Sequence, residues 1–308
     1  MNVRSLKCLS LLLSVAFGLS AVAQAGPADV RAKSQSSPVT VPFFADDGHG
    51  HPVSSVTQAD FSILDNKNPP QTVVAIQRAN ELPLRLGILI DTSNSEKQSH
   101  LYKPGMEATS NFVNYMLKRA EDRAFIETFN EVSHATNFLG GDELSKFKID
   151  MTPGGGTALY DAVYVACIAR MKIDTTHPAR RVLVILSDGG ENQSHRTQDE
   201  AVAAAQATGT VIFAVSTNEE RDGYQDNGRL KELADKAGGY AFLNLYGGDL
   251  PKVFSTISEQ VGGMYFLTYI PVDSDQPKKY HSIELKPISD KKLKLRAPKG
   301  YYVSAEVK

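Results

Sequence analysis

The sequence lacks the signatures of several common enzyme classes. It contains no Gly-x-Ser-x-Gly elbow, no Gly-x-Gly-x-x-Gly fingerprint after an expected strand, and no lysine after its run of three glycines. The first two patterns mark a nucleophile turn and a dinucleotide site, and a site for a nucleoside triphosphate needs the lysine. The chain is therefore expected not to be an enzyme.

Long apolar runs are also scarce. One such run, Leu9–Val22, follows Arg4 and Lys7 and precedes a small-x-small pattern at residues 23–25. This is the layout of a secretory signal peptide, and the run is too short to span a bilayer comfortably. No later segment approaches about 18 consecutive apolar residues. We expect residues 1–25 to be a signal peptide and the mature chain to be exported, periplasmic or extracellular, without a membrane span.

Cysteine and excess charge are equally limited. Without residues 1–25 the chain keeps one cysteine, Cys167, so no intramolecular disulfide can form. Its apolar surroundings in the sequence favour a buried small hydrophobe over a reactive thiol. The formal net charge moves from −2 to −4 when those residues are removed. This mildly acidic balance gives no reason to expect nucleic acid as a partner.

The order of apolar segments predicts an α/β chain with β flanks. Residues 26–80 form an N-terminal β segment, 81–262 an α/β domain, and 263–308 a C-terminal β segment that we expect to pack with 38–80 as one small module. Short apolar strands alternating with helices indicate a Rossmann-like, doubly wound, mostly parallel sheet. In the central domain the expected strands are 84–90, 123–129, 181–187, 210–216 and 240–244, with an edge strand within 131–139. The expected helices lie within 102–117, 159–171, 199–207, 230–237 and 250–261. The flanking strands are 39–44, 61–65, 71–78, 264–270, 281–287 and 292–298.

Five oxygen-bearing side chains fall at one edge of this expected sheet. Asp91, Ser93 and Ser95 follow one strand, Asp188 follows another, and Thr157 follows three glycines at the start of a helix. Ligands of open parallel sheets bind at the carboxyl ends of the strands, at a topological switch point. An oxygen-only set without cysteine or histidine suits a hard divalent cation, with Mg²⁺ favoured because Ca²⁺ usually takes more carboxylate and carbonyl ligands.

The same residues resemble a known family. The pattern Asp-x-Ser-x-Ser, then a distant Thr, then a distant Asp is similar to the metal-ion-dependent adhesion site (MIDAS) of von Willebrand factor A domains. The resemblance covers roughly residues 84–261, and the flanks resemble a bacterial subgroup of exported proteins of this type. It implies a site for Mg²⁺, with Mn²⁺ or Ca²⁺ as alternatives, in which both serines and, in the high-affinity state, the threonine contact the metal. The aspartates then often act through water. It also implies a partner protein that donates a Glu or Asp carboxylate to the open position.

Two positions depart from the family pattern. Asn94 stands where Gly is frequent, and Glu96 stands where Met is frequent. Neither change removes a ligand, although Glu96 could alter the charge at this edge of the sheet, which we call the rim. In related domains the last helix, here 250–261, can shift when a ligand binds.

Several alternatives remain open from the sequence. Each site residue alone could be an ordinary strand end, cap or turn. Asp161 could orient a ligand or simply favour the helix start. A Mg²⁺-dependent phosphatase would need a nucleophile and a phosphate-binding cation near the rim, and only Lys97 and Arg196 are close in sequence. A purely structural metal is a further alternative. The pair His49 and His51 lies in a glycine-rich turn, where a solvated loop is favoured over a zinc site.

Overall fold

The computed structural model describes residues 37–70, 72–144, 152–173, 177–218, 227–272, 280–288 and 292–302. The expected signal peptide, residues 1–25, lies outside them. These described residues belong to one compact unit. Among the described residues, no helix is both long enough and apolar enough to cross a membrane.

Six strands form the central sheet, in the spatial order β6-β5-β4-β7-β8-β9. All neighbours are parallel except β6, which pairs antiparallel with β5. The chain runs outward from β4 to one edge and then outward from β7 to the other, so the switch point lies between β4 and β7. The strands are β4 (Leu84–Asp91), β5 (Arg123–Phe129), β6 (Ser133–Ala135), β7 (Arg180–Ser187), β8 (Thr210–Ser216) and β9 (Tyr240–Phe242).

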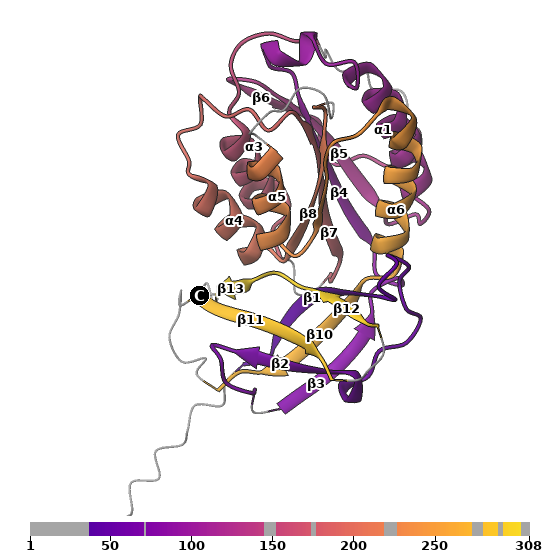
Figure 1. Ribbon diagram of the computed structural model, residues 1–308, viewed down its shortest axis with the longest axis vertical. Helices are drawn as coiled ribbons and strands as arrows, with labels where there is room; N and C mark the ends of the chain where they lie inside the picture. Colours follow the sequence, from indigo (N-terminus) through magenta and orange to yellow (C-terminus); the bar gives the residue numbers. More distant parts are fainter. Residues whose placement is uncertain are drawn as a thin grey trace, which may run out of the picture. The chain divides into compact units, whose positions relative to one another are not determined.

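Helices cover both faces of this sheet (Figure 1). Side chains of a strand alternate between faces, so the nearly continuous apolar strands supply two cores. Leu86 and Ile88 belong to the core shared with α1 and α6, whereas Leu89 belongs to the core shared with α3, α4 and α5. The helices are α1 (Tyr102–Met116), α2 (Gly141–Leu144), α3 (Leu159–Val165), α4 (Gln198–Ala207), α5 (Asn227–Lys236) and α6 (Leu250–Gly262).

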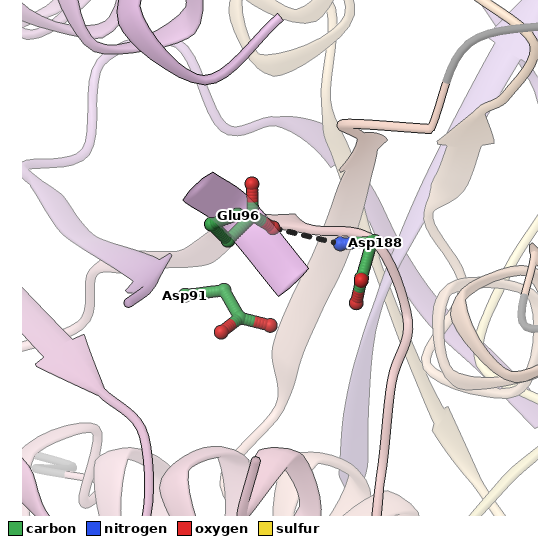
Figure 2. A group of neighbouring side chains, drawn as sticks. All are labelled: Asp91, Glu96 and Asp188. Atoms are coloured by element: carbon green, nitrogen blue, oxygen red, sulfur yellow. Dashed lines mark hydrogen bonds between the residues drawn. The ribbon is translucent and has the colours of Figure 1, made fainter. Parts of the chain in front are cut away.

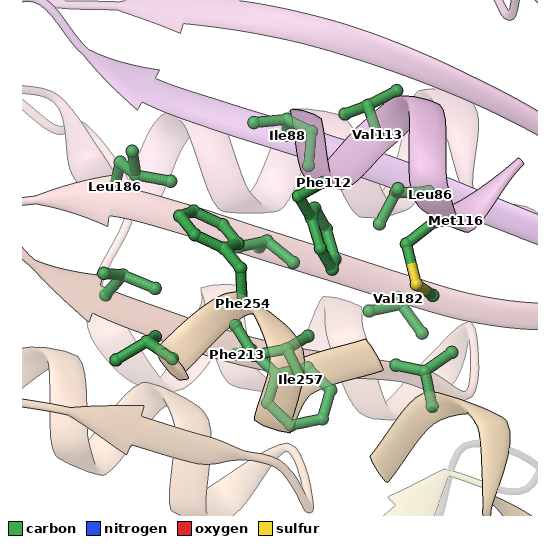
Figure 3. Packing of buried hydrophobic residues seen from close by; sticks show 14 of the residues in the cluster. Leu86, Ile88, Phe112, Val113, Met116, Val182, Leu186, Phe213, Phe254 and Ile257 are labelled. Carbon is green, nitrogen blue, oxygen red and sulfur yellow. The ribbon is translucent and has the colours of Figure 1, made fainter. Parts of the chain in front are cut away.

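The first core is built on an amphipathic helix. Helix α6 buries Leu250, Val253, Phe254, Ile257 and Val261, the spacing of one helical face. Figure 3 shows Phe254 and Phe112 of α1 packed over the strands, with ring centroids 5.0 Å apart. This contact holds the last helix of the α/β region against the first.

The flanking segments pair with each other, as expected. One sheet has the order β12-β1-β10-β3 and another the order β13-β11-β2, so each mixes strands from before and after the α/β region. The strands are β1 (Val39–Asp46), β2 (Phe61–Asp65), β3 (Thr72–Arg78), β10 (Tyr265–Ile270), β11 (Tyr280–Pro287), β12 (Lys294–Arg296) and β13 (Gly300–Tyr302). We call these seven strands the β module. The predicted fold class is thereby confirmed, whereas the domain boundaries remain predictions.

The two chain crossings between module and α/β region lie side by side. Strand β3 leads into the α/β region and β10 leaves it, and the two are antiparallel neighbours. Directly after β3, the Ala79 backbone N–H donates to the Met264 carbonyl at 2.8 Å. The whole α/β region is therefore inserted between two paired strands.

Three local features differ from the sequence-based expectation. The expected helix over 159–171 ends as a π-helix at Ala166–Arg170. The short strand β13 and the one-turn helix α2 were not predicted. Strand β13 has three residues and pairs with β11, so tertiary pairing rather than a sequence pattern defines it.

Candidate metal centre

The carboxyl ends of β4 and β7 bring two site residues together. Ile90 pairs with Leu186, which places Asp91 and Ser187 side by side at the switch point. The Ser187 hydroxyl donates to Asp91 Oδ2 at 2.6 Å, and the Ser93 backbone N–H donates to Asp91 Oδ1 at 2.9 Å. Asp91 is fully buried, and these two donors fix its carboxylate.

The loop after β4 carries both serines toward one point. The Oγ atoms of Ser93 and Ser95 are 3.0 Å apart, so alternate positions of the loop do aim at a shared space. Ser93 is buried and Ser95 is exposed. A short 3₁₀ turn, η2 (Asn94–Lys97), follows.

The glycine loop is hydrogen bonded to this serine loop. The Gly154 N–H donates to the Thr92 carbonyl at 2.7 Å, and the Asn94 N–H donates to the Gly155 carbonyl at 3.0 Å. Gly155 has φ +78°, a conformation that other residues adopt at a cost. The glycines therefore let the loop lie against residues 92–94 and carry Thr157 to the rim.

Thr157 lies beside Asp188. A Cβ placed on Gly190 would be 2.9 Å from Asp188 Oδ1 and 3.6 Å from Thr157 Oγ1, so both oxygens lie close to that glycine. The Thr157 N–H donates to Asn192 Oδ1 at 3.0 Å. Helix α3 takes Ala158 as its N-cap without a side-chain cap, so the ordinary capping role of Thr157 is not observed.

Glu96 is the functional candidate that sequence reasoning missed. Its side chain is buried in the η2 turn, and its Oε1 accepts from the Thr217 hydroxyl at 2.7 Å and the Asp188 N–H at 3.1 Å. Among the described residues its Oε2 has no hydrogen-bond partner, although it is buried. The departure from Met was visible in the sequence, but the inward direction of the side chain was not.

Three carboxylates surround one space in this site (Figure 2). Ligand oxygens of Asp91, Glu96 and Asp188 lie within 4.8 Å of one another. Two oxygens bound to one Ca²⁺ at 2.3–2.6 Å can be about 5 Å apart, so any two of these oxygens can share one ion. The carboxylate and hydroxyl oxygens gathered here fit a hard divalent cation.

Burial and mutual repulsion disfavour three charges here without a cation. Burial raises the pKa of Asp91 to about 7, and the Asp188 charge adds to the increase against the hydrogen bonds from Ser187 and Ser93. Burial, together with the charges of Asp91 and Asp188, raises the pKa of Glu96 well above its ordinary value. A divalent cation would offset both effects.

No family model matches the chain, and no curated protein matches it. Solved structures do match. The chain is similar to von Willebrand factor A domains. One match is a von Willebrand factor type A protein from Catenulispora acidiphila, at 10% identity and a TM-score of 0.46, over 89% of this chain and 76% of that one.

Two further matches are a mussel byssus protein and a bacterial membrane protein. Proximal thread matrix protein 1 of the mussel byssus, solved with a zinc-occupied MIDAS motif, is 14% identical with a TM-score of 0.49 over 64% of this chain and 49% of that one. An aerotolerance-related membrane protein from Bacteroides fragilis is 15% identical with a TM-score of 0.41 over 58% of this chain and 98% of that one. This chain therefore spans about half of the mussel protein.

Asp161 supports the site indirectly. It accepts from the backbone N–H groups of His195 at 3.0 Å and Arg196 at 2.7 Å. In return, the Ser194 hydroxyl accepts from the N–H groups of Tyr160 and Asp161 at the start of α3. Asp161 thus fixes the loop after β7 to α3, and its carboxylate bonds to that loop, at His195 and Arg196.

The other residues considered from the sequence have partners of their own or are buried. The His51 side chain is 74% exposed and lies 3.8 Å from Glu259, consistent with a solvated loop. Lys97 Nζ donates to Asn94 Oδ1 at 2.8 Å, and Arg196 pairs with Glu200 at 3.0 Å. Cys167 is buried, and burial raises the pKa of its thiol to about 12.

Proposed function

We propose that this chain is a protein-binding module that uses a divalent cation at the β4–β7 switch point. The observation that carries the proposal is the meeting of Asp91, Asp188 and the serine pair at the ends of two neighbouring strands. Mg²⁺ is the proposed ion, with Mn²⁺ and Ca²⁺ as alternatives.

The chain's own residues would hold the ion with two kinds of oxygen, neutral and charged. Ser93, Ser95 and Thr157 offer neutral oxygens, whereas Asp91 and Asp188 offer charge. Asp91 is oriented by two hydrogen bonds and Asp188 by its position directly after β7. A bound ion would supply an electrophilic centre for an oxygen ligand from outside.

The partner in this proposal is a protein with an exposed Glu or Asp. Ser95 is exposed and Asp188 is partly exposed, so the site has a solvent-facing side. We propose binding rather than catalysis, because the nearest basic side chains in sequence, Lys97 and Arg196, bond to Asn94 and Glu200. Export of the mature chain is part of the proposal, since the expected partner would then be extracytoplasmic.

The test begins with the cation and continues with the partner. The chain without residues 1–25 is titrated with Mg²⁺, Mn²⁺, Ca²⁺ and Zn²⁺ by calorimetry. It is then immobilised and exposed to extracytoplasmic proteins of its source with Mg²⁺ or with EDTA. Asp188→Ala is the test variant, and Asp199→Ala is the control, because Asp199 is 86% exposed and bonds only to Lys236 in the described structure.

We expect a protein to be retained only with metal, by the unchanged chain and by Asp199→Ala. Equal retention with EDTA, or by Asp188→Ala, would contradict a metal-dependent interface. Cation binding without any retained protein would instead favour a structural metal.

A further inference from the structure

The turn after β5 holds the glycine loop on both sides of Thr157. The Gly156 N–H donates to Glu131 Oε1 at 2.9 Å, and the Ala158 N–H donates to the Asn130 carbonyl at 2.7 Å. Thr157 lies between these two donors in the chain. The two bonds therefore fix the backbone directly before and directly after Thr157.

The loop after β7 holds the backbone of Thr157 itself. The Thr157 N–H donates to Asn192 Oδ1 at 3.0 Å, and the Thr157 carbonyl accepts from the N–H groups of Asn192 and Gln193, each at 3.0 Å. Three consecutive N–H groups, at residues 156, 157 and 158, are thus bonded to neighbouring loops. Thr157 is 3% exposed, so the place of its hydroxyl depends on these bonds.

Of these acceptors, only Glu131 is an acidic side chain. A hydrogen bond to an ionised acceptor is roughly twice as strong as one between neutral groups. The side chain also packs on the loop, because a Cβ built on Gly155 would be 3.3 Å from Glu131 Oε1 and 3.6 Å from its Cγ. Glu131 is exposed, so replacing it leaves no buried cavity.

We propose that Glu131 is a positioning residue of the cation site, whose carboxylate holds the Gly156 N–H and thereby sets where the Thr157 hydroxyl meets the ion. This inference rests on the metal site of the proposed function. Groups that orient a metal ligand contribute to metal affinity without touching the metal. The role requires an acceptor at residue 131 rather than a negative charge, which separates it from simple attraction of a cation.

The test compares Glu131→Ala with Glu131→Gln. Alanine removes the acceptor, whereas glutamine removes the charge and keeps an oxygen for the Gly156 N–H. Mg²⁺ and Mn²⁺ affinities are measured by calorimetry. We expect Glu131→Ala to weaken the binding of both cations roughly tenfold, and Glu131→Gln to weaken it by less than about twofold.

The chain offers a matched control at Glu143. This residue is also an exposed glutamate that accepts from a glycine N–H, that of Gly140 at 3.0 Å. Glu143→Ala should leave both cation affinities unchanged, because Glu143 does not hold the Gly156 N–H.

A second comparison asks whether Glu131 acts through Thr157. In a Thr157→Ala background, Glu131→Ala should weaken Mn²⁺ binding by less than about a further twofold, because the ligand that it positions is gone. An undiminished loss in that background, equal losses in Glu131→Ala and Glu131→Gln, or no loss in Glu131→Ala would each overturn the positioning role while leaving the metal site intact. Failure of the unchanged chain to bind either cation would overturn the proposed site as well.

Discussion

Buried carboxylates in this molecule differ in what compensates them. Asp122 accepts three backbone N–H groups, from Leu84 at 2.8 Å, Lys118 at 3.1 Å and Arg119 at 2.8 Å. Glu127 on β5 is also buried, but burial raises its pKa to about 7 because Ser133 and Arg170 offset it only in part. The Arg170 Nε atom is 4.0 Å from its carboxylate. Glu127 is therefore a source of pH-dependent instability.

Glu127→Gln should remove much of this dependence. A folded-state pKa near 7, above the ordinary 4.5, means that the folded chain binds the proton more tightly than the unfolded chain. Stability is then highest below pH 4.5 and falls as the pH rises toward 7, by up to about 3 kcal/mol. At pH 8 the variant should exceed the unchanged chain by about 1–3 kcal/mol, and near pH 4 the two should agree.

Urea unfolding between pH 4 and 8 measures this difference. Glu284→Gln is the control, because that side chain is 54% exposed and should leave the profile unchanged. Parallel profiles for Glu127→Gln and the unchanged chain would show that Glu127 does not titrate in this range.

For single residues, the sequence predicts which residue types form the site, and in which order, better than it predicts where each side chain points. Asp91, Ser93, Ser95, Thr157 and Asp188 are identifiable because a strand or a glycine run precedes each group. Their role as ligands remains a prediction. The orientation of Glu96 depends on the η2 turn and on a hydrogen bond from the Thr217 hydroxyl. These two residues are far apart in the chain. No local pattern encodes such a contact.

Among the elements, the glycine loop connects fold and site most directly. Gly155 has φ +78°, and a Cβ there would lie 3.3 Å from Glu131 Oε1. Gly154 has no atom within 4 Å of a built Cβ and no positive φ. Two adjacent glycines thus offer a matched pair of substitutions.

Gly155→Ala should destabilise the chain by about 1–2 kcal/mol, the cost of a left-handed residue. That corresponds to a melting temperature lower by roughly 2–4 °C in a chain of this size. Cation affinity should also fall, because the loop carries Thr157. Gly154→Ala should match the unchanged chain in thermal melts and calorimetry. Equal effects of the two substitutions would mean that backbone conformation does not position this loop.

The sequence also predicts some helices and strands better than others. The central strands follow from continuous apolar runs, and β5 and β8 match their expected ranges. The sequence did not predict the π-helical end of α3 or the three-residue strand β13, because their hydrogen bonds depend on packing partners. Short elements carry too few residues for periodicity to identify them.

At the scale of the whole molecule, the β module contributes to the core of the α/β region. Phe44 of β1 is buried in the same core as α1 and α6, and its ring centroid is 5.8 Å from that of Phe213 on β8. The Lys299 N–H also donates to the Lys236 carbonyl at 3.0 Å, which joins the C-terminal flank to α5. The two parts therefore share side-chain and backbone contacts.

Phe44→Ala should lower stability by about 3–5 kcal/mol, the cost of a large cavity in a core. Because the core is shared, unfolding should remain one transition in far-ultraviolet and near-ultraviolet circular dichroism. Val74→Ala on β3 is the control, since Val74 is 53% exposed. Two separated transitions in the unchanged chain would show that the parts are stable independently.

The insertion of the α/β region between β3 and β10 has a consequence for the order of folding. In an unfolded chain, pairing these strands closes a loop from Ala79 to Met264, which costs roughly 3 kcal/mol more in entropy than closing a tight turn. Once the α/β region has formed, its two ends meet at a 2.8 Å hydrogen bond, and the long loop becomes in effect a short one. The pairing of β3 with β10 should thus follow the central sheet in time. Hydrogen exchange during refolding would contradict this order if β3 amides became protected before those of β4.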